Sequence, residues 1–262
     1  MEPRRLLPRL SPDVRAVLAG YGAKAAWPAG FTIYQRGTPA DGLFVVLGGR
    51  VVLRSRVKAG RGFVPGLAVA GETFGAEGLA PRATYATDAR AEDASETLHV
   101  SGAALRTFLR EQPLHGQQLL GQVMAERTEM LEKLRELATL SVEERLIAAM
   151  VRLAERAPAE RALTDRALTD RAVGANGAAH APLVLGANQY RLLCELVGAT
   201  RESVSLVFNR LAAAGVVERD GANYTVPDVG ALASRLGAVW QEADAAVPVV
   251  REPGVGGRAA RV

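Results

Sequence analysis

Residues 189–213 have the sequence QYRLLCELVGATRESVSLVFNRLAA, and this stretch decides the fold of the C-terminal half of the chain. Leu193, Leu196 and Val197 form an apolar face ahead of a break at Gly198, and helical spacing resumes after Thr200. Gly198 can adopt the positive φ of a tight turn, and the Thr200 hydroxyl can cap the next helix. The pattern predicts a helix-turn-helix. The simpler alternative is a helical hairpin whose polar residues only face water.

The second of these helices carries side chains that suit contacts with DNA. Arg201 can pair with guanine through two hydrogen bonds, and Glu202 can accept a hydrogen bond from cytosine. With Val204 and Val207 buried, Leu206 falls on the outer face. There a leucine either contacts a thymine methyl group or extends the core at its rim. The predicted DNA-binding residues are Thr200, Arg201, Glu202, Ser203, Ser205, Leu206, Asn209, Arg210 and Arg219.

The next segment, GVVERDGANYTVPD at 215–228, contains two short strand-like runs around Asp220-Gly221. An Asp-Gly pair between such runs is a strong signal of a β-hairpin. A helix-turn-helix followed by a hairpin is a winged helix. In this arrangement Arg219 and the amides of the turn can contact the phosphate backbone.

Between residues 30 and 100 the chain consists of short apolar runs separated by glycine or proline. The runs are FTIY, LFVVL, RVVLR, FVPGLAV and ETLHV. This pattern predicts a small antiparallel β-roll of the jelly-roll kind. Gly48-Gly49 stands between two runs, where we expect a two-residue hairpin turn.

After Pro113 the periodicity becomes helical, with a stripe of residues spaced alternately by four and three. This spacing lasts for about three heptads and predicts the seam of a parallel coiled-coil dimer, in which Arg127 sets the register. The alternative is one amphipathic helix that packs on its own domain. The stripe begins at Gly116, and the predicted dimerisation residues are Leu120, Val123, Arg127, Met130, Leu134 and Leu137.

Helix signals and changes in composition divide the chain. Ser141 ahead of two glutamates starts a new helix, which makes 139–141 a candidate hinge. The stretch 157–182 contains RALTDRALTDRAV and GANGAAHAP without apolar periodicity, so we expect a surface insertion. The predicted fold class is α+β, with a β-roll at 1–112, a dimerisation helix and hinge at 113–140, a winged helix at 141–240 and a disordered tail at 241–262.

Composition restricts what else the chain can be. It has 262 residues, a net charge of +4 and one cysteine, Cys194. One thiol excludes an intramolecular disulfide and thiolate-rich metal clusters, so we expect no metal and no cofactor. The longest uncharged stretch, 172–190, is too polar to span a bilayer, and the N-terminus lacks the apolar centre of a secretory signal. We therefore expect a cytoplasmic protein without membrane contacts.

Four segments in a fixed order resemble the CRP/FNR family of bacterial transcription regulators. They are ADGLFVVLGGRV at 40–51, GETFGAEGL at 71–79, the seam helix, and LVGATRESVSLVFNRL at 196–211. The resemblance covers about residues 27–236. It implies an effector-type β-roll, a dimerisation helix, and a winged helix that binds an inverted-repeat operator in double-stranded DNA. RNA polymerase is the further partner that it implies.

The sequence departs from the cAMP-binding members of this family at the expected ligand contacts. Their ribose, phosphate and adenine contacts fall here on Ala76, Thr84 and Met130-Leu131. A buried phosphate without a guanidinium partner loses a strong charge-assisted pair, so we expect no control by cAMP. Arg82 and Arg90 lie nearby in the sequence, so a rearranged pocket that uses one of them for the phosphate stays an alternative. The residues of this effector-pocket-like region are Gly75, Ala76, Glu77, Thr84, Tyr85, Met130 and Leu131.

Together these features predict a homodimeric, sequence-specific transcription regulator that is not an enzyme. Two modes of action stay open: activity without an effector, and gating by an unidentified small ligand in the β-roll. An alternative from a different class is the regulatory module of an enzyme system. Nothing in the sequence supports it, because the sequence contains no phosphate-binding loop, kinase motif or nucleophile elbow.

Overall fold

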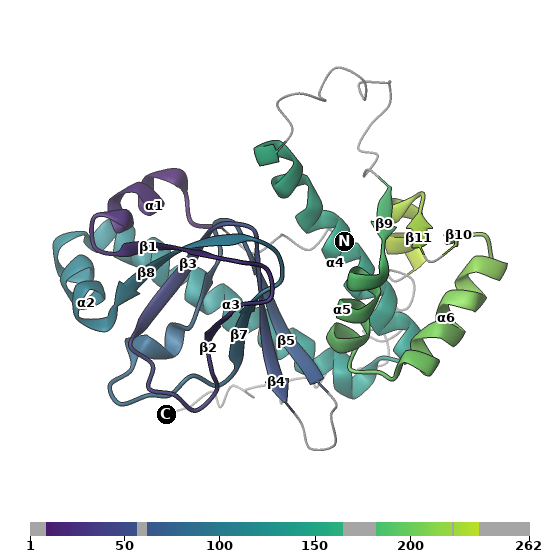
Figure 1. Ribbon diagram of the computed structural model, residues 1–262, viewed down its shortest axis with the longest axis horizontal. Helices are drawn as coiled ribbons and strands as arrows, with labels where there is room; N and C mark the ends of the chain where they lie inside the picture. Colours follow the sequence, from purple (N-terminus) through teal and green to yellow (C-terminus); the bar gives the residue numbers. More distant parts are fainter. Residues whose placement is uncertain (1–8, 57–61, 165–181, 222, 236–262) are drawn as a thin grey trace, which may run out of the picture.

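The computed structural model describes residues 9–56, 62–164, 182–221 and 223–235, and Figure 1 shows them as two bodies side by side. One body is built from strands, with the long helix α3 (Pro113–Thr139) behind them, and the other from helices with a small sheet. The predicted α+β class is confirmed. Within the described ranges, no helix is both long and apolar enough to cross a membrane.

The strand-rich body is a β-roll of two four-stranded antiparallel sheets. The first sheet has the order β1 (Ala23–Trp27), β8 (Ser95–Ser101), β3 (Gly42–Gly48), β6 (Thr73–Phe74). The second has the order β2 (Thr32–Tyr34), β7 (Asp88–Ala91), β4 (Arg50–Arg56), β5 (Gly62–Val69). Side chains from both sheets share a buried core that includes Phe44, Val46, Val51 and Ala89. The predicted roll is confirmed, and all five apolar runs overlap strands.

The hairpin expected at Gly48-Gly49 is wrong. β3 and β4 belong to different sheets, so the two glycines join sheets instead of paired strands. Gly49 has a φ of 74°, and a Cβ atom there would lie 2.5 Å from the carbonyl oxygen of Ala94. Only glycine combines this backbone conformation with so little space, which explains why the chain can turn the corner of the roll here.

Helices cover the outer side of the first sheet. α1 (Pro12–Ala19), α2 (Gly102–Glu111) and the start of α3 bury their apolar faces against β3 and β8. This contact attaches the long helix to the roll. Its cluster includes Leu18, Leu43, Leu98, Leu105, Phe108 and Leu119.

Helix α3 confirms the predicted long helix, and its contact with the roll partly covers the predicted seam. A Cβ atom at Gly116 would lie 2.9 Å from Leu109, and Val123 and Leu137 are half-buried. Spacing alone cannot choose between adjacent stripes of one helix; of the predicted dimerisation residues, Leu120, Arg127, Met130 and Leu134 are exposed, and Met124 and Leu131 are exposed beside them. This exposed stripe, called the seam below, comprises Leu120, Met124, Arg127, Leu131 and Leu134.

Helix α4 (Val142–Thr164) begins at a capping box. Glu144 N donates to Ser141 Oγ at 3.3 Å, and Ser141 N donates to the Glu144 carboxylate at 2.6 Å. The predicted helix start is confirmed. The predicted insertion starts too early, because residues 157–164 continue α4. Its later part, 165–181, and the predicted tail at 241–262 lie outside the described residues.

The second body combines α4 with α5 (Ala187–Val197), α6 (Arg201–Ala213) and a sheet of order β10 (Glu218–Asp220), β11 (Asn223–Val226), β9 (Leu183–Leu185). Asp220 pairs with Asn223 around Gly221, whose φ is 58°, so the predicted hairpin is confirmed. The strand β9 was not predicted, because three residues show no periodicity. Leu193 and Val197 lie in the core of this body, but Leu196 packs against the roll.

Candidate functional site

The turn between α5 and α6 has the predicted geometry. Gly198 is left-handed, with φ 65° and ψ 35°, and Ser203 N donates to Thr200 Oγ1 at 3.3 Å. Val204 and Phe208 are buried in the core that α6 shares with α4 and α5. The opposite side of α6 faces away from the β-roll, at the edge of the molecule in Figure 1.

Polar side chains and one leucine cover the outer side of α6, called the reading face below. Leu206 is 63% exposed and belongs to none of the hydrophobic clusters of the described residues. The structure thus brings the predicted residues of α6 other than Arg210 together on one surface, with Leu206 outside the core. Exposed or half-buried beside it are Thr200, Arg201, Glu202, Ser203, Ser205 and Asn209.

The charges along α6 have different surroundings. At the N-terminus, the Glu202 backbone N–H and the Thr200 hydroxyl hold the pKa of Glu202 below its ordinary value, so its carboxylate stays an ionised acceptor. Near the C-terminus, Arg210 Nη1 lies 3.1 Å from Glu143 Oε2 of α4. Arg210 therefore contacts its own domain. Arg201, the other arginine of α6, lies at the start of the reading face.

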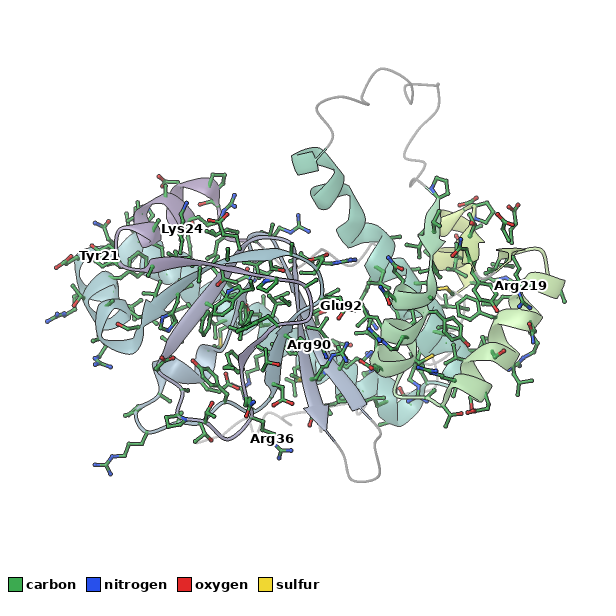
Figure 2. All side chains as sticks on the ribbon, viewed as in Figure 1. Tyr21, Lys24, Arg36, Arg90, Glu92 and Arg219 are labelled. Atoms are coloured by element: carbon green, nitrogen blue, oxygen red, sulfur yellow. The ribbon has the colours of Figure 1, made fainter. Side chains whose placement is uncertain are left out.

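Arg219 lies on the wing formed by β10 and β11, but it turns back onto this hairpin. Its Nε donates to the Gly221 carbonyl at 3.3 Å, and its guanidinium carbon lies 5.8 Å from the centre of the Tyr224 ring. Figure 2 shows Arg219 on the side of this body that faces away from the roll. A contact between Arg219 and a phosphate stays a prediction.

An aromatic cluster that the sequence did not reveal joins α5, α6 and the wing. The Phe208 ring lies 4.4 Å from Tyr224 and 5.5 Å from Tyr190, measured between ring centres. The Tyr190 hydroxyl also donates to the Arg201 carbonyl at 3.3 Å. These contacts fix the wing relative to the reading face. No spacing rule connects rings at positions so far apart in the sequence.

Aromatic side chains of the chain itself fill the effector region of the roll. Tyr34 and Tyr85 stack with ring centres 3.7 Å apart, and Phe44 and Phe74 stack at 5.0 Å. None of these four residues is more than 8% exposed. Gly75 closes over the rings, since a Cβ atom there would lie 3.2 Å from Tyr85 and 3.3 Å from Phe44 and Tyr34. Burial raises the pKa of both tyrosines, so their hydroxyls stay neutral.

The other residues predicted for this region do not gather around one pocket. Ala76 begins a short 3-10 helix, and the Glu77 carboxylate of this helix accepts a hydrogen bond from Ala86 N at 3.1 Å. Thr84 is exposed, and Met130 and Leu131 lie 37% and 56% exposed on α3. Thr84, Met130 and Leu131 thus lie on the surface of one chain, because other residues of α3 turn toward the roll, and their place at an effector pocket stays a prediction.

Gln122 and Glu126 are the α3 residues that face this part of the roll, and sequence reasoning missed them. The Glu126 carboxylate accepts hydrogen bonds from the Thr73 hydroxyl and the Gln122 amide. Burial raises the pKa of Glu126 to about 7, and the nearby charge of Glu72 adds to this effect. The spacing of four residues signals a shared helix face, but nothing in the sequence shows that the face is covered.

We expect Glu126→Gln to remove a pH dependence of stability. The folded-state pKa of about 7 exceeds the ordinary 4.5, so between these values the folded protein keeps a proton that the unfolded chain has lost. Wild-type stability should therefore fall as pH rises through this range, by about 3 kcal/mol in total, and level off above it. Urea unfolding at a series of pH values measures this, with the partly exposed Glu132→Gln as control. Equal pH profiles for wild type and Glu126→Gln would contradict it.

Two family models match separate parts of the chain. Residues 25–112 match the cyclic nucleotide-binding domain, and residues 144–235 match the Crp-like helix-turn-helix domain. Among curated proteins, the CRP-like cAMP-activated global transcriptional regulator of Mycobacterium tuberculosis is 25% identical over 233 residues. That alignment covers 86% of this chain and 93% of the relative.

Solved structures share the fold. The c-di-GMP responsive global regulator CLP of Xanthomonas campestris has a TM-score of 0.61 at 21% identity, with 82% of this chain and 99% of that chain covered. A CRP/FNR-family transcriptional regulator of Thermus thermophilus has a TM-score of 0.60 at 21% identity, with coverage of 82% and 98%. At these identities the likeness establishes the arrangement of roll, long helix and winged helix.

Proposed function

Because the chain belongs to the CRP/FNR family of transcription regulators, we propose that it binds an inverted-repeat DNA operator as a homodimer and that cAMP does not control it. The reading face of α6 supports the proposed binding to DNA. Its polar residues take no part in the core, and they project from the helix that a winged helix-turn-helix places in the major groove. The wing beside it offers Arg219 and turn amides to the phosphate backbone.

The seam on α3 supports the homodimer. Leu120, Met124, Leu131 and Leu134 are 46%, 52%, 56% and 53% exposed in one chain, on one side of one helix. A stripe of large apolar residues along one helix is the kind of surface that a parallel coiled coil covers with a second copy. Arg127 interrupts the stripe, as a polar residue that sets register does at some cost in stability. A two-fold dimer matches two half-sites about one helical turn apart.

Arg201 and Leu206 are the residues that we propose to read bases. The Arg201 guanidinium can form two hydrogen bonds with guanine, and Glu202 can accept from cytosine. Leu206 lies one helical turn after Glu202, and its exposed side chain cannot donate a hydrogen bond. It can contact the methyl group of thymine, so each half-site should carry a thymine at the position facing Leu206.

Selection of operators from a random DNA library tests this function. We expect wild type to recover an inverted repeat, and Leu206→Arg to change the preferred base at one position of each half-site by roughly 1–3 kcal/mol. Arg201→Ala should weaken specific binding by a similar amount. Arg36→Ala, on the roll surface in Figure 2, is the matched control and should change neither. If wild type selects no shared sequence, the proposed sequence-specific DNA binding is wrong. If wild type and Leu206→Arg select identical half-sites, Leu206 does not contribute to sequence recognition.

The filled effector region supports the second part of the proposal. Tyr34, Phe44, Phe74 and Tyr85 occupy the interior beside Gly75. The two arginines near this region in the sequence do not supply the missing phosphate partner. Arg82 is exposed with a φ of 59°, and the Arg90 guanidinium is directed at Gly30, where a Cβ atom would lie 2.9 Å from its Nη2. A cyclic phosphate in this region would thus lack a guanidinium partner.

We therefore expect isothermal titration calorimetry to detect no binding of cAMP at micromolar concentration. The affinity for the selected operator should be the same with and without the nucleotide, because aromatic side chains occupy the interior beside Gly75 and neither Arg82 nor Arg90 is placed to pair with the phosphate. Saturable binding coupled to tighter operator binding would overturn this expectation. Such a result would favour gating by a small ligand, which is the second candidate mode of action.

A transcription regulator of this kind acts in the cytoplasm, where it meets both operator DNA and RNA polymerase. We propose this compartment and this further partner on the family relation alone. The chain has no proposed catalytic role.

A further inference from the structure

Four charged side chains alternate in sign where the β-roll meets the first helix of the helix-turn-helix. Arg54 of β4 and Glu92, which follows β7, belong to the roll, while Arg191 and Glu195 project from α5. Arg54 Nη2 lies 3.2 Å from Glu92 Oε2, and Arg54 Nη1 lies 3.2 Å from Glu195 Oε2. Arg191 Nη2 lies 3.8 Å from Glu92 Oε1. These residues, called the quartet below, connect the two bodies, and Figure 2 shows Glu92 between them.

An apolar contact joins the roll to the same helix, α5. Val64 and Leu67 of β5 and Val52 of β4 form a buried cluster with Leu192 of α5. Leu196 packs against the same cluster. Leu192 and Leu196 therefore lie on a side of α5 that faces the roll and not the core of the winged helix.

Three members of the quartet are largely shielded from water, whereas the Arg191 side chain is 48% exposed. The side chains of Glu92, Arg54 and Glu195 are only 11%, 20% and 21% exposed. Charges in such surroundings interact more strongly and are screened less by salt than charges on an open surface. Loss of one partner also leaves its neighbours as uncompensated, poorly hydrated charges. The contact between the bodies is therefore sensitive to the charges of Arg54, Glu92 and Glu195.

We propose that Arg54, Glu92, Arg191 and Glu195 are positioning residues for DNA binding: the quartet holds the winged helix in the orientation that presents α6 to the operator. This inference rests on the proposed function. The orientation of α5 determines that of α6, because the two helices share one core and are joined only by the turn 198–200. The reading face stays exposed while the quartet is formed. With its effector region already filled, the roll orients the winged helix through this contact and without a ligand.

Orientation matters because a dimer must place two recognition helices in successive major grooves at once. A winged helix that rocks on the roll spends only part of its time in the competent arrangement. Its apparent affinity falls by that fraction, although every residue that touches DNA is unchanged.

Glu92→Gln tests the proposal, with Glu96→Gln as the matched control. Glu96 is also a glutamate of the roll, but its carboxylate lies 4.0 Å from Lys24 and is half exposed. We expect Glu92→Gln to bind the selected operator about tenfold more weakly and Glu96→Gln to bind like wild type. Arg54→Gln should show a similar loss with an unchanged slope of affinity against salt, because Arg54 neutralises no phosphate.

Two further measurements separate positioning from a general structural role. Hydrogen exchange without DNA should become faster in 62–69 and 187–197 of Glu92→Gln, and stay unchanged in the wing at 218–226. The double variant Arg54→Gln/Glu195→Gln should lose no more operator affinity than either single variant, since both act through one contact.

The outcomes are distinct. If wild type binds no operator, the proposed function fails, while the exchange data still report on the quartet. If wild type binds and Glu92→Gln binds equally well, the positioning role is wrong. Tighter binding by Glu92→Gln would also overturn it, because the quartet would then hold the winged helix away from DNA.

Discussion

Replacing Leu131 and Leu134 together by aspartate is expected to give a monomer whose operator affinity is at least about 100-fold lower than that of wild type. Both leucines lie on the seam and are more than half exposed in one chain, at 56% and 53%. In a parallel dimer the substitutions would place four carboxylates in an apolar interface, where each loses its hydration without gaining a partner. A monomer reaches one half-site at a time and loses the benefit of linked binding.

Sedimentation velocity and operator titration measure the two parts of this result. Phe31→Asp is the control, since Phe31 is an apolar residue of the roll with 47% exposure and lies outside α3. Val123→Asp probes the register, because Val123 is half-buried in one chain and borders the seam. A double variant that stays dimeric would remove the seam from the interface.

Glu136→Ala is expected to lower the free energy of unfolding by about 3–5 kcal/mol. The Glu136 side chain has no exposed surface, and its two oxygens lie 2.5 and 2.8 Å from the two terminal nitrogens of Arg152. Lys133 of the same helix is 6% exposed, and burial together with Arg152 lowers its pKa to about 8. Without the carboxylate, both cations lose this counter-charge in a poorly hydrated place between α3 and α4.

Urea unfolding at one protein concentration measures the effect, because the stability of a dimer depends on concentration. Glu132→Ala is the control on the same helix. Glu132 is 39% exposed beside Arg135, so its loss should change the free energy by no more than about 0.5 kcal/mol. The double variant Glu136→Met/Arg152→Met should recover part of the lost stability, since it removes both charges. A Glu136→Ala variant as stable as Glu132→Ala would show that the pair does not hold the two helices together.

Sequence patterns predicted the winged helix well because its signals are local. Gly198 in the left-handed region, the Thr200 cap and the Asp220-Gly221 turn each act within a few residues. The same reasoning failed at Gly48-Gly49, since a pair of glycines signals a sharp turn but not whether the next strand pairs or joins another sheet. Nor could it show that Met130 and Leu131, the positions where relatives contact adenine, are exposed on α3 in one chain.

The sequence by itself determined the succession of β-roll, long helix and winged helix, the helix-turn-helix with its hairpin, and the side chains of α6 that form the reading face. These depend on caps, turns and periodicity, which are properties of neighbouring residues. Only the tertiary structure decided which stripe of α3 is exposed, that Tyr34 and Tyr85 stack in the roll, and that Arg54 and Glu195 meet. Periodicity shows that a helix has an apolar face, but it cannot say which distant surface covers that face. The contacts that settle this question join residues from separate parts of the chain.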